Sequence, residues 1–267
     1  MEYNLKRILI CSVLILMAVV SFLFASRAAA APENHAETIN SIDEKVDTVF
    51  RLTASSTLAS AGISAIPGDT ATPIAAKLAD FTEYFLLILC VLYAEKYLIT
   101  IIGAGTFKVL IPVACLFLLI GMFWNPKMMK KLGVKIAVFG LAIFFTIPLS
   151  IRVSDMIYDT YRESIDNTIT TAEEFTEKTA EISEAREDAG LLASVLNRLS
   201  ESASSLSNKA AKILNNFVES LAVMIVTSCV IPLLVLVFFL WLIRIITGID
   251  ITANMRPYIG RHGENEK

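Results

Sequence analysis

An adjacent acid–base pair, Glu95–Lys96, interrupts an apolar run over residues 84–103, and a second apolar run follows at 109–124. A charged side chain at the centre of a membrane helix costs about 2.5–3.5 kcal/mol on translocon scales, and such residues usually mark ion or proton pathways. Neighbouring residues of a helix do not face each other, so Glu95 and Lys96 each need a separate partner or water. The pair is therefore the candidate intramembrane polar site of the chain.

Other side chains that could carry catalysis or bind a metal are few and scattered. The two histidines, His35 and His262, lie outside the apolar runs. No nucleophile elbow, phosphate-binding loop or HExxH motif is present in the sequence. We predict that the protein is not an enzyme and has no catalytic residue, no cofactor and no bound metal. The cysteines lie within apolar runs, without disulfide or zinc spacing, at Cys11, Cys90, Cys115 and Cys229.

The composition indicates a membrane protein. Of 267 residues, 55% are hydrophobic, and the mean hydropathy is +0.63. Several apolar runs approach the roughly 20 residues that a helix needs to cross a bilayer. The formal charge of −3 argues against a nucleic-acid partner, which would require a basic surface. We therefore predict an all-α, polytopic helical membrane protein with the lipid bilayer as one of its partners.

The N-terminal segment resembles a secretory signal. A basic pair, Lys6–Arg7, precedes an apolar run over 8–25, and small residues in an A-x-A pattern follow. The apolar run is longer than the usual signal-peptide core of about 7–15 residues. A cleaved signal peptide and an uncleaved signal anchor therefore both remain open. In either case, the chain from about residue 32 onward emerges on the extracytoplasmic side.

A polar region over 152–217 carries two apolar series whose spacing alternates between four and three residues, as in the seam of a coiled coil. Gly190 lies between the two series and provides a turn. We predict a long antiparallel helical hairpin, coiled-coil-like, with each helix running on into its span. The large seam residues are Tyr161, Ile165, Phe175, Ile182, Leu192, Leu196, Leu199, Leu206, Ile213 and Phe217.

The faces of this hairpin away from the seam are acidic. Between Ser154 and Phe217 there are twelve acidic and six basic residues. The simplest interpretation is a solvated surface. Several seam positions are small or polar, so the two helices would close tightly but weakly. Such a hairpin suits a structure that a partner, or another copy of the chain, completes.

These patterns divide the chain into six segments. They are a signal peptide or signal anchor at 1–30, an extracytoplasmic polar and helical segment at 31–83, transmembrane helices at 84–151 with a basic loop at 125–135, the helical hairpin at 152–217, a transmembrane helix at 218–247, and a hydrophilic tail at 248–267.

The side of the membrane on which the hairpin lies is left open by the sequence. Basic short loops tend to remain cytoplasmic, which places 125–135 inside and the hairpin outside. That arrangement requires an odd number of crossings over 84–124. In one interpretation only about 97–124 crosses, and Glu95–Lys96 lies at a boundary. In the other, both apolar runs cross, the pair lies within the membrane, and the hairpin is cytoplasmic.

The stretch "VDTVFRLTASSTLASAGISAIPGDTATPIAAKLADFTEYF", followed by the apolar run with "EKYL", resembles an uncharacterised group of bacterial inner-membrane proteins. The resemblance covers the first half of the chain. In that group, an N-terminal signal or anchor precedes a loop of this pattern, followed by helical spans and a charged helical segment. The resemblance implies a multi-pass location in a bacterial inner membrane and carries over no activity and no site residues.

We therefore predict a non-enzymatic membrane scaffold, or an assembly or interaction protein, whose acidic hairpin binds a partner or self-associates. The expected protein partner is another membrane or envelope protein, or further copies of the chain. One alternative is a subunit of an ion channel or transporter with Glu95 and Lys96 in the membrane, although the spans are too few for inverted repeats. A second alternative is an envelope sensor, although the tail at 248–267 is too short for an output domain.

Overall fold

A computed structural model describes residues 2–64, 72–123, 126–187 and 192–247, with side chains described within 5–64, 72–123, 127–179 and 208–245. Every described residue except Ala31 is helical, and the described part contains no strand, so the predicted all-α class is confirmed. In chain order the elements are α1 (Glu2–Val20), the π-helical turn η1 (Ser21–Ala25), α2 (Ser26–Ala30), the 3₁₀ turn η2 (Pro32–His35), α3 (Ala36–Ser64), α4 (Thr72–Gly105), the π-helical turn η3 (Thr106–Leu110), α5 (Ile111–Phe123), α6 (Pro126–Glu187), α7 (Leu192–Ile225), the π-helical turn η4 (Val226–Val230) and α8 (Ile231–Thr247).

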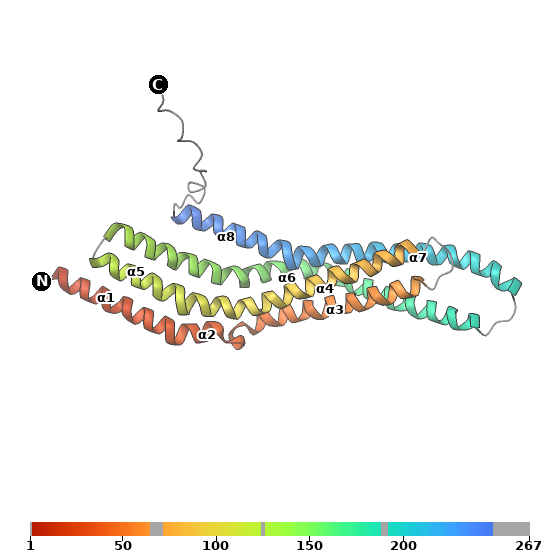
Figure 1. Cartoon of the computed structure of the whole chain (residues 1–267), viewed down its shortest axis with the longest axis horizontal. Helices are drawn as coiled ribbons and strands as arrows, with labels where there is room; N and C mark the ends of the chain where they lie inside the picture. Colours follow the sequence, from red (N-terminus) through yellow and green to blue (C-terminus); the bar gives the residue numbers. More distant parts are fainter. Residues whose placement is uncertain (1, 65–71, 124–125, 188–191, 248–267) are drawn as a thin grey trace, which may run out of the picture.

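The molecule is elongated, with its long helices running side by side (Figure 1). The longest, α6, has 62 residues, which corresponds to about 93 Å at the rise of an α-helix. Within the described part, four helical stretches are long and apolar enough to cross a membrane. These stretches are Leu5–Ala30, Thr72–Phe123, Lys127–Thr179 and Asn208–Ile245.

The two apolar runs after residue 84 belong to one uninterrupted helix. α4, η3 and α5 follow one another without a break over 52 residues, so Gly103 and Gly105 form no turn. The interpretation in which the two runs cross the membrane separately is therefore wrong. The sequence suggested it because glycines usually mark turns, but a glycine is tolerated inside a helix when neighbouring helices pack against it.

The described part of the predicted basic loop at 125–135, from Pro126 onward, is also helical. α6 begins at Pro126, a residue favoured in the first turn of a helix because its ring pre-sets φ and its missing N–H is not needed there. The lysines of this stretch therefore lie on the first turns of α6 and not in a loop. From there α6 continues to Glu187, and α7, η4 and α8 likewise form one continuous path, as expected for helices that run on into their spans.

Four helical segments form a bundle at one end of the molecule: α3, the first part of α4, the second part of α6, and α7. Serine hydroxyls tie two of these helices together, because Ser56 and Ser60 of α3 donate to the carbonyls of Leu78 and Ala75 on α4, at 2.6 and 2.8 Å. The largest fully buried side chains of the described residues are all apolar and lie in this core: Phe85, Phe217, Ile42, Leu52, Ile63, Leu78, Ile88, Leu92, Ile165, Ile169, Ile213 and Met224.

The N-terminal helices pack along α5 at the other end. Cys11 Sγ lies 3.7 Å from Met122 Sδ, and Ser21 Oγ donates to the Phe107 carbonyl at 2.7 Å. α2 approaches α4 closely at Gly103, where an added Cβ would lie 2.1 Å from the Ala29 carbonyl oxygen. This glycine is therefore needed for the packing of α2 against α4 and not for a turn.

Replacing Gly103 with alanine should weaken the docking of α2. The added methyl group would collide with backbone atoms, which cannot rotate away, and overpacking of this kind costs about 1–3 kcal/mol. Thermal unfolding of the purified protein in detergent should show a lower midpoint for Gly103→Ala. Gly105→Ala is the matched control, because no atom lies within 4 Å of its added Cβ, and it should not lower the midpoint. Equal midpoints for the two variants would contradict the proposed close contact.

Candidate functional site

A buried lysine on α3 is the centre of a polar layer between the helices. Lys45 is only 2% exposed, and its Nζ lies 2.7 Å from Ser154 Oγ and 2.7 Å from Asp155 Oδ1, both on α6. The same ammonium group lies 5.8 Å from the centroid of the Tyr158 ring, within the range of a cation–π contact. A fully buried lysine is rare unless it is paired, so these partners explain how the charge is tolerated.

Hydroxyl groups strengthen the layer and extend it to one further element, η4. Ser41 Oγ donates to Asp155 Oδ1 at 2.5 Å, which gives the carboxylate a second partner from α3. Ser154 Oγ donates to the Thr227 carbonyl at 2.7 Å, inside the π-helical turn η4. A π-helical turn disturbs the i to i−4 hydrogen-bond pattern, so the serine satisfies a carbonyl that regular helix would use internally. One polar layer thus joins α3, α6 and η4.

Glu95 and Lys96, the candidate intramembrane pair, turn toward different partners. Lys96 Nζ forms an ion pair with Asp43 Oδ1 of α3 at 2.5 Å, and both side chains are partly exposed. Glu95 is partly buried and interacts electrostatically with Lys45 and Cys229. Each residue therefore has separate surroundings, as expected for neighbours on a helix, and only Glu95 faces the polar layer.

Sequence reasoning missed the centre of this layer. Lys45 lies three residues after Ile42 and four before Val49, both of which are buried in the core. A lysine on the apolar face of an amphipathic helix is the signal that could have identified it. The partners Ser154 and Asp155 could not have been found in this way, because more than 100 residues separate them from Lys45.

The groups in this layer, an ion pair with hydroxyl partners, are typical of a structural ion pair. Among the described residues, no group of three or more histidine, cysteine, aspartate or glutamate side chains could hold a metal ion. One hydroxyl, Ser228 Oγ, is buried without a hydrogen-bond partner in the described structure. The arrangement holds one cation between α3, α6 and η4, with Asp155 as its counter-ion, and Glu95 of α4 is a second acid that interacts with it electrostatically.

Of the five predicted seam residues with described side chains, four are buried and belong to the core of the bundle. Ile165, Phe175, Ile213 and Phe217 are each 5% exposed or less. Tyr161 departs from this pattern: it is 41% exposed, and the residue one turn earlier, Tyr158, is buried at 3%.

Hydrogen bonds join α6 and α7 in this region. Ser164 Oγ donates to Glu219 at 3.2 Å and Ser220 Oγ donates to Thr168 Oγ1 at 3.1 Å. The turn near Gly190 lies outside the described residues, so the complete coiled-coil hairpin stays a prediction. The same holds for the seam side chains that are not described, Ile182, Leu192, Leu196, Leu199 and Leu206.

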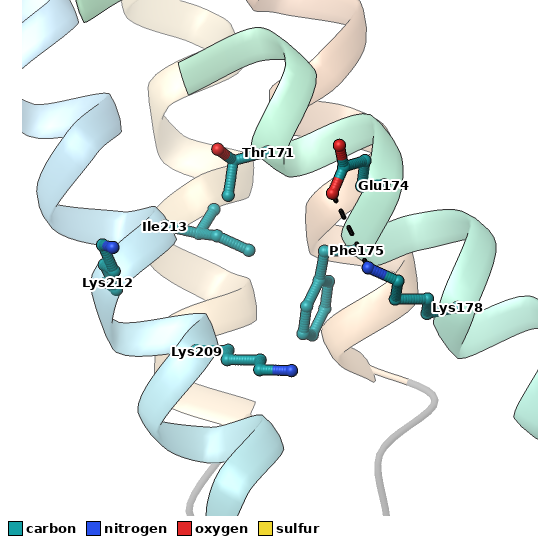
Figure 2. A pocket seen from close by; sticks show the side chains of 7 residues that line it. All are labelled: Thr171, Glu174, Phe175, Lys178, Lys209, Lys212 and Ile213. Carbon is teal, nitrogen blue, oxygen red and sulfur yellow. Dashed lines mark ion pairs between the residues drawn. The ribbon is translucent and has the colours of Figure 1, made fainter. Parts of the chain in front are cut away.

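A shallow cleft of about 220 Å³ lies between α6 and α7 (Figure 2). Its apolar lining includes Phe175 and Ile213, and three lysines stand around it. Lys178 forms an ion pair with Glu174 at 3.6 Å, whereas Lys209 and Lys212 form no ion pair with a described residue. In a region with twice as many acids as bases, this cleft is a local basic site with an apolar floor.

Comparison with protein-family models, with curated proteins and with solved structures finds no significant match. The likeness of the first half of the chain to bacterial inner-membrane proteins is therefore a prediction that these comparisons leave untested.

Removing the carboxylate that faces Lys45 should destabilise the bundle. We expect Asp155→Asn to lower the free energy of unfolding by about 1–3 kcal/mol, because a buried ammonium loses its counter-charge. The loss should be smaller than for a wholly buried pair, since the Asp155 side chain is 31% exposed. The measurement is denaturant unfolding in detergent, followed by circular dichroism.

The control for this prediction is an exposed ion pair on the same helices. Arg51 and Asp166 lie 3.4 Å apart with side chains 45% and 50% exposed. Arg51→Met should change stability by less than about 1 kcal/mol, as is typical of surface pairs. A larger effect for Arg51→Met than for Asp155→Asn would show that burial does not decide the strength of these contacts.

Proposed function

We propose that the protein is a non-enzymatic scaffold of a bacterial inner membrane, with a helical bundle that docks an envelope protein through α6 and α7. The observation that carries this proposal is the projection of α6 and α7 beyond the ends of α3 and α4 (Figure 1). Gly62, near the end of α3, lies beside Thr176, and α6 continues to Glu187. The last turns of the α6–α7 pair are thus not covered by α3 or α4.

The interior of the bundle favours a supporting role over a ligand-binding one. Its core is filled with large aliphatic and aromatic side chains, most of them less than 2% exposed. Continuous helices connect this core to the apolar segments, so the bundle is held rigidly relative to the membrane helices. A rigid bundle of this kind is suited to holding a partner at a fixed distance from the membrane.

The cleft between α6 and α7 indicates the kind of partner. Phe175 and Ile213 offer an apolar contact, and Lys209 and Lys212 leave two positive charges beside it without an ion-pair partner among the described residues. A helix or extended segment with one apolar side chain flanked by acidic residues would complement both features. We expect the partner to present such a segment.

Charge distribution supports an extracytoplasmic bundle. Met122 lies beside Cys11, and Gly121 lies beside Lys130, so the basic N-terminus and the lysines of α6 lie at the same end of the molecule. By the positive-inside rule this end faces the cytoplasm. Because residues 72–123 form one helix, a single crossing leads from this end to the bundle on the other side.

Site-specific photo-crosslinking in intact cells tests the docking proposal. A photoreactive residue at Lys209 should yield one adduct of defined mass, and Lys212→Glu should reduce its yield at least fivefold because the acidic segment is repelled. The same residue at Thr160, an exposed position on α6 away from the cleft, should not yield this adduct. Equal adducts at both positions, or none at Lys209, would contradict the proposal.

A channel or transporter subunit is the second candidate, and the inward orientation of Glu95 favours it. Glu95 interacts electrostatically with the buried Lys45, and Ser228 Oγ is a buried hydroxyl without a hydrogen-bond partner among the described residues; groups of this kind are typical of ion or proton paths. In proteoliposomes, Glu95→Gln should then change ion flux by at least tenfold. Unchanged flux, together with a lost cross-link in the Lys212→Glu variant, would decide for the scaffold.

A further inference from the structure

Apart from the exposed Lys108, the outer face of the helix over 84–123 is apolar, and its length exceeds the thickness of a bilayer. Forty residues of helix extend about 60 Å, whereas the hydrocarbon core of a bilayer measures about 30 Å. Large apolar side chains are exposed along the whole length, from Tyr84 at 53% to Phe123 at 82%. A single crossing can therefore cover only about half of this face.

Contacts with the N-terminal helix indicate which half the bilayer covers. The N-terminal helix formed by α1 and η1 is exposed and apolar, with Leu16 63% and Phe24 71% exposed, so it must lie in lipid. It packs beside α5 and η3, where Ser21 bonds to Phe107. The hydrocarbon core therefore surrounds the part of the helix after Gly103, and the apolar face before it lies beyond the hydrocarbon.

We call this uncovered surface the α4 face. It consists of seven large side chains and two small ones between them. Seven large side chains, each about half exposed, offer on the order of 700 Å², close to the roughly 800 Å² per partner of a standard interface. Its members are Tyr84, Leu86, Leu87, Cys90, Tyr93, Ala94, Tyr97, Leu98 and Ile101.

The charged residues between Tyr84 and Ile101 lie off the α4 face. Lys96 is held against α3 by Asp43, and Glu95 interacts with Lys45. The exposed charges of α4 occur earlier: Lys77 and Asp80 pair with each other at 3.0 Å, and Glu83 is exposed at the edge of the α4 face, one residue before Tyr84. The α4 face is thus uncharged and rich in tyrosine, a composition typical of the core of a protein interface and unusual for a surface in water.

We propose that the α4 face binds the α4 face of a second copy of this chain. Insertion in one membrane sets both copies at the same height and in the same orientation, so a two-fold axis along the membrane normal brings the two apolar stretches together and leaves the charged stretches level with each other. The face has no charge that would require a complementary one, and its area matches what a stable dimer needs. The small side chains Cys90 and Ala94, one turn apart, allow the two helices to approach closely. This association is separate from docking through α6 and α7.

Cys90 provides a native probe of this interface. In a Cys11→Ala, Cys115→Ala, Cys229→Ala background, Cys90 is the only thiol, and it is exposed on the α4 face. Treatment of native membranes with a short bis-maleimide should convert most of the protein to a covalent dimer. Purified wild-type protein in nanodiscs should show, by mass photometry after correction for lipid, a protein mass of twice 29.3 kDa.

Two alanine positions on α4 give a matched pair of variants. Ala94 lies within the α4 face and Ala79 lies in the polar stretch before it, and both are exposed. Ala94→Arg should reduce the Cys90 cross-link at least tenfold by placing a charge in the interface, and Ala79→Arg should leave the yield unchanged. Because both side chains are exposed, both variants should keep the circular dichroism of the wild type.

Three results would overturn the proposal. One is a monomer in nanodiscs that gives no Cys90 cross-link. Another is a Cys90 thiol that resists a membrane-impermeant maleimide in the monomer, which would show that lipid covers the α4 face. The third is a Cys90 adduct with a different protein in place of the dimer. If the protein forms the Cys90 dimer but gives no photo-adduct at Lys209, docking through α6 and α7 is contradicted and the dimer proposal is not.

Discussion

The ion pair between Lys45 and Asp155 is the interaction on which the arrangement of the helices depends. Apolar faces of long helices can slide past one another by a turn and still bury similar areas. A buried ammonium group cannot, because a shift of one turn would remove it from Asp155 and Ser154 and leave a charge unpaired in the interior. This single contact, extended through Ser154 to Thr227, therefore sets the register of α3, α6 and the α7–α8 path.

Helices of this length also need local adjustment, and serine residues accompany each adjustment. The three π-helical turns lie between α1 and α2, between α4 and α5, and between α7 and α8. In each turn one carbonyl accepts a serine hydroxyl: Phe22 from Ser26, Phe107 from Ser21, and Thr227 from Ser154. Two of these bonds cross between helices. Each π-helical turn therefore changes the phase of the helix, and a serine hydrogen bond stabilises the turn.

In the proposed arrangement, apolar surface lies both inside the bilayer and above it. We propose that lipid covers the apolar residues of α1 and α5, and that the α4 face continues along the same helix beyond the hydrocarbon. In this proposal the partner binds at the α6–α7 end of the bundle, and the second copy binds at the α4 face. Two paired helical bundles bend less easily than a single bundle. Membrane height, which is equal for all copies, provides the alignment of that pairing.

Periodicity, composition and apolar length in the sequence by themselves determined the helical class, the presence of membrane-length helices, and the separate surroundings of Glu95 and Lys96. These features depend on the spacing and the length of apolar runs, and both can be read from a single segment without knowing what it packs against. Tertiary structure alone decided that Gly103 lies within a helix and that Lys45 is the centre of the polar layer. The first depends on the approach of Ala29 and the second on Asp155, and both partners are distant in sequence. A contact between distant segments leaves no mark on local spacing, so only the packed helices reveal it.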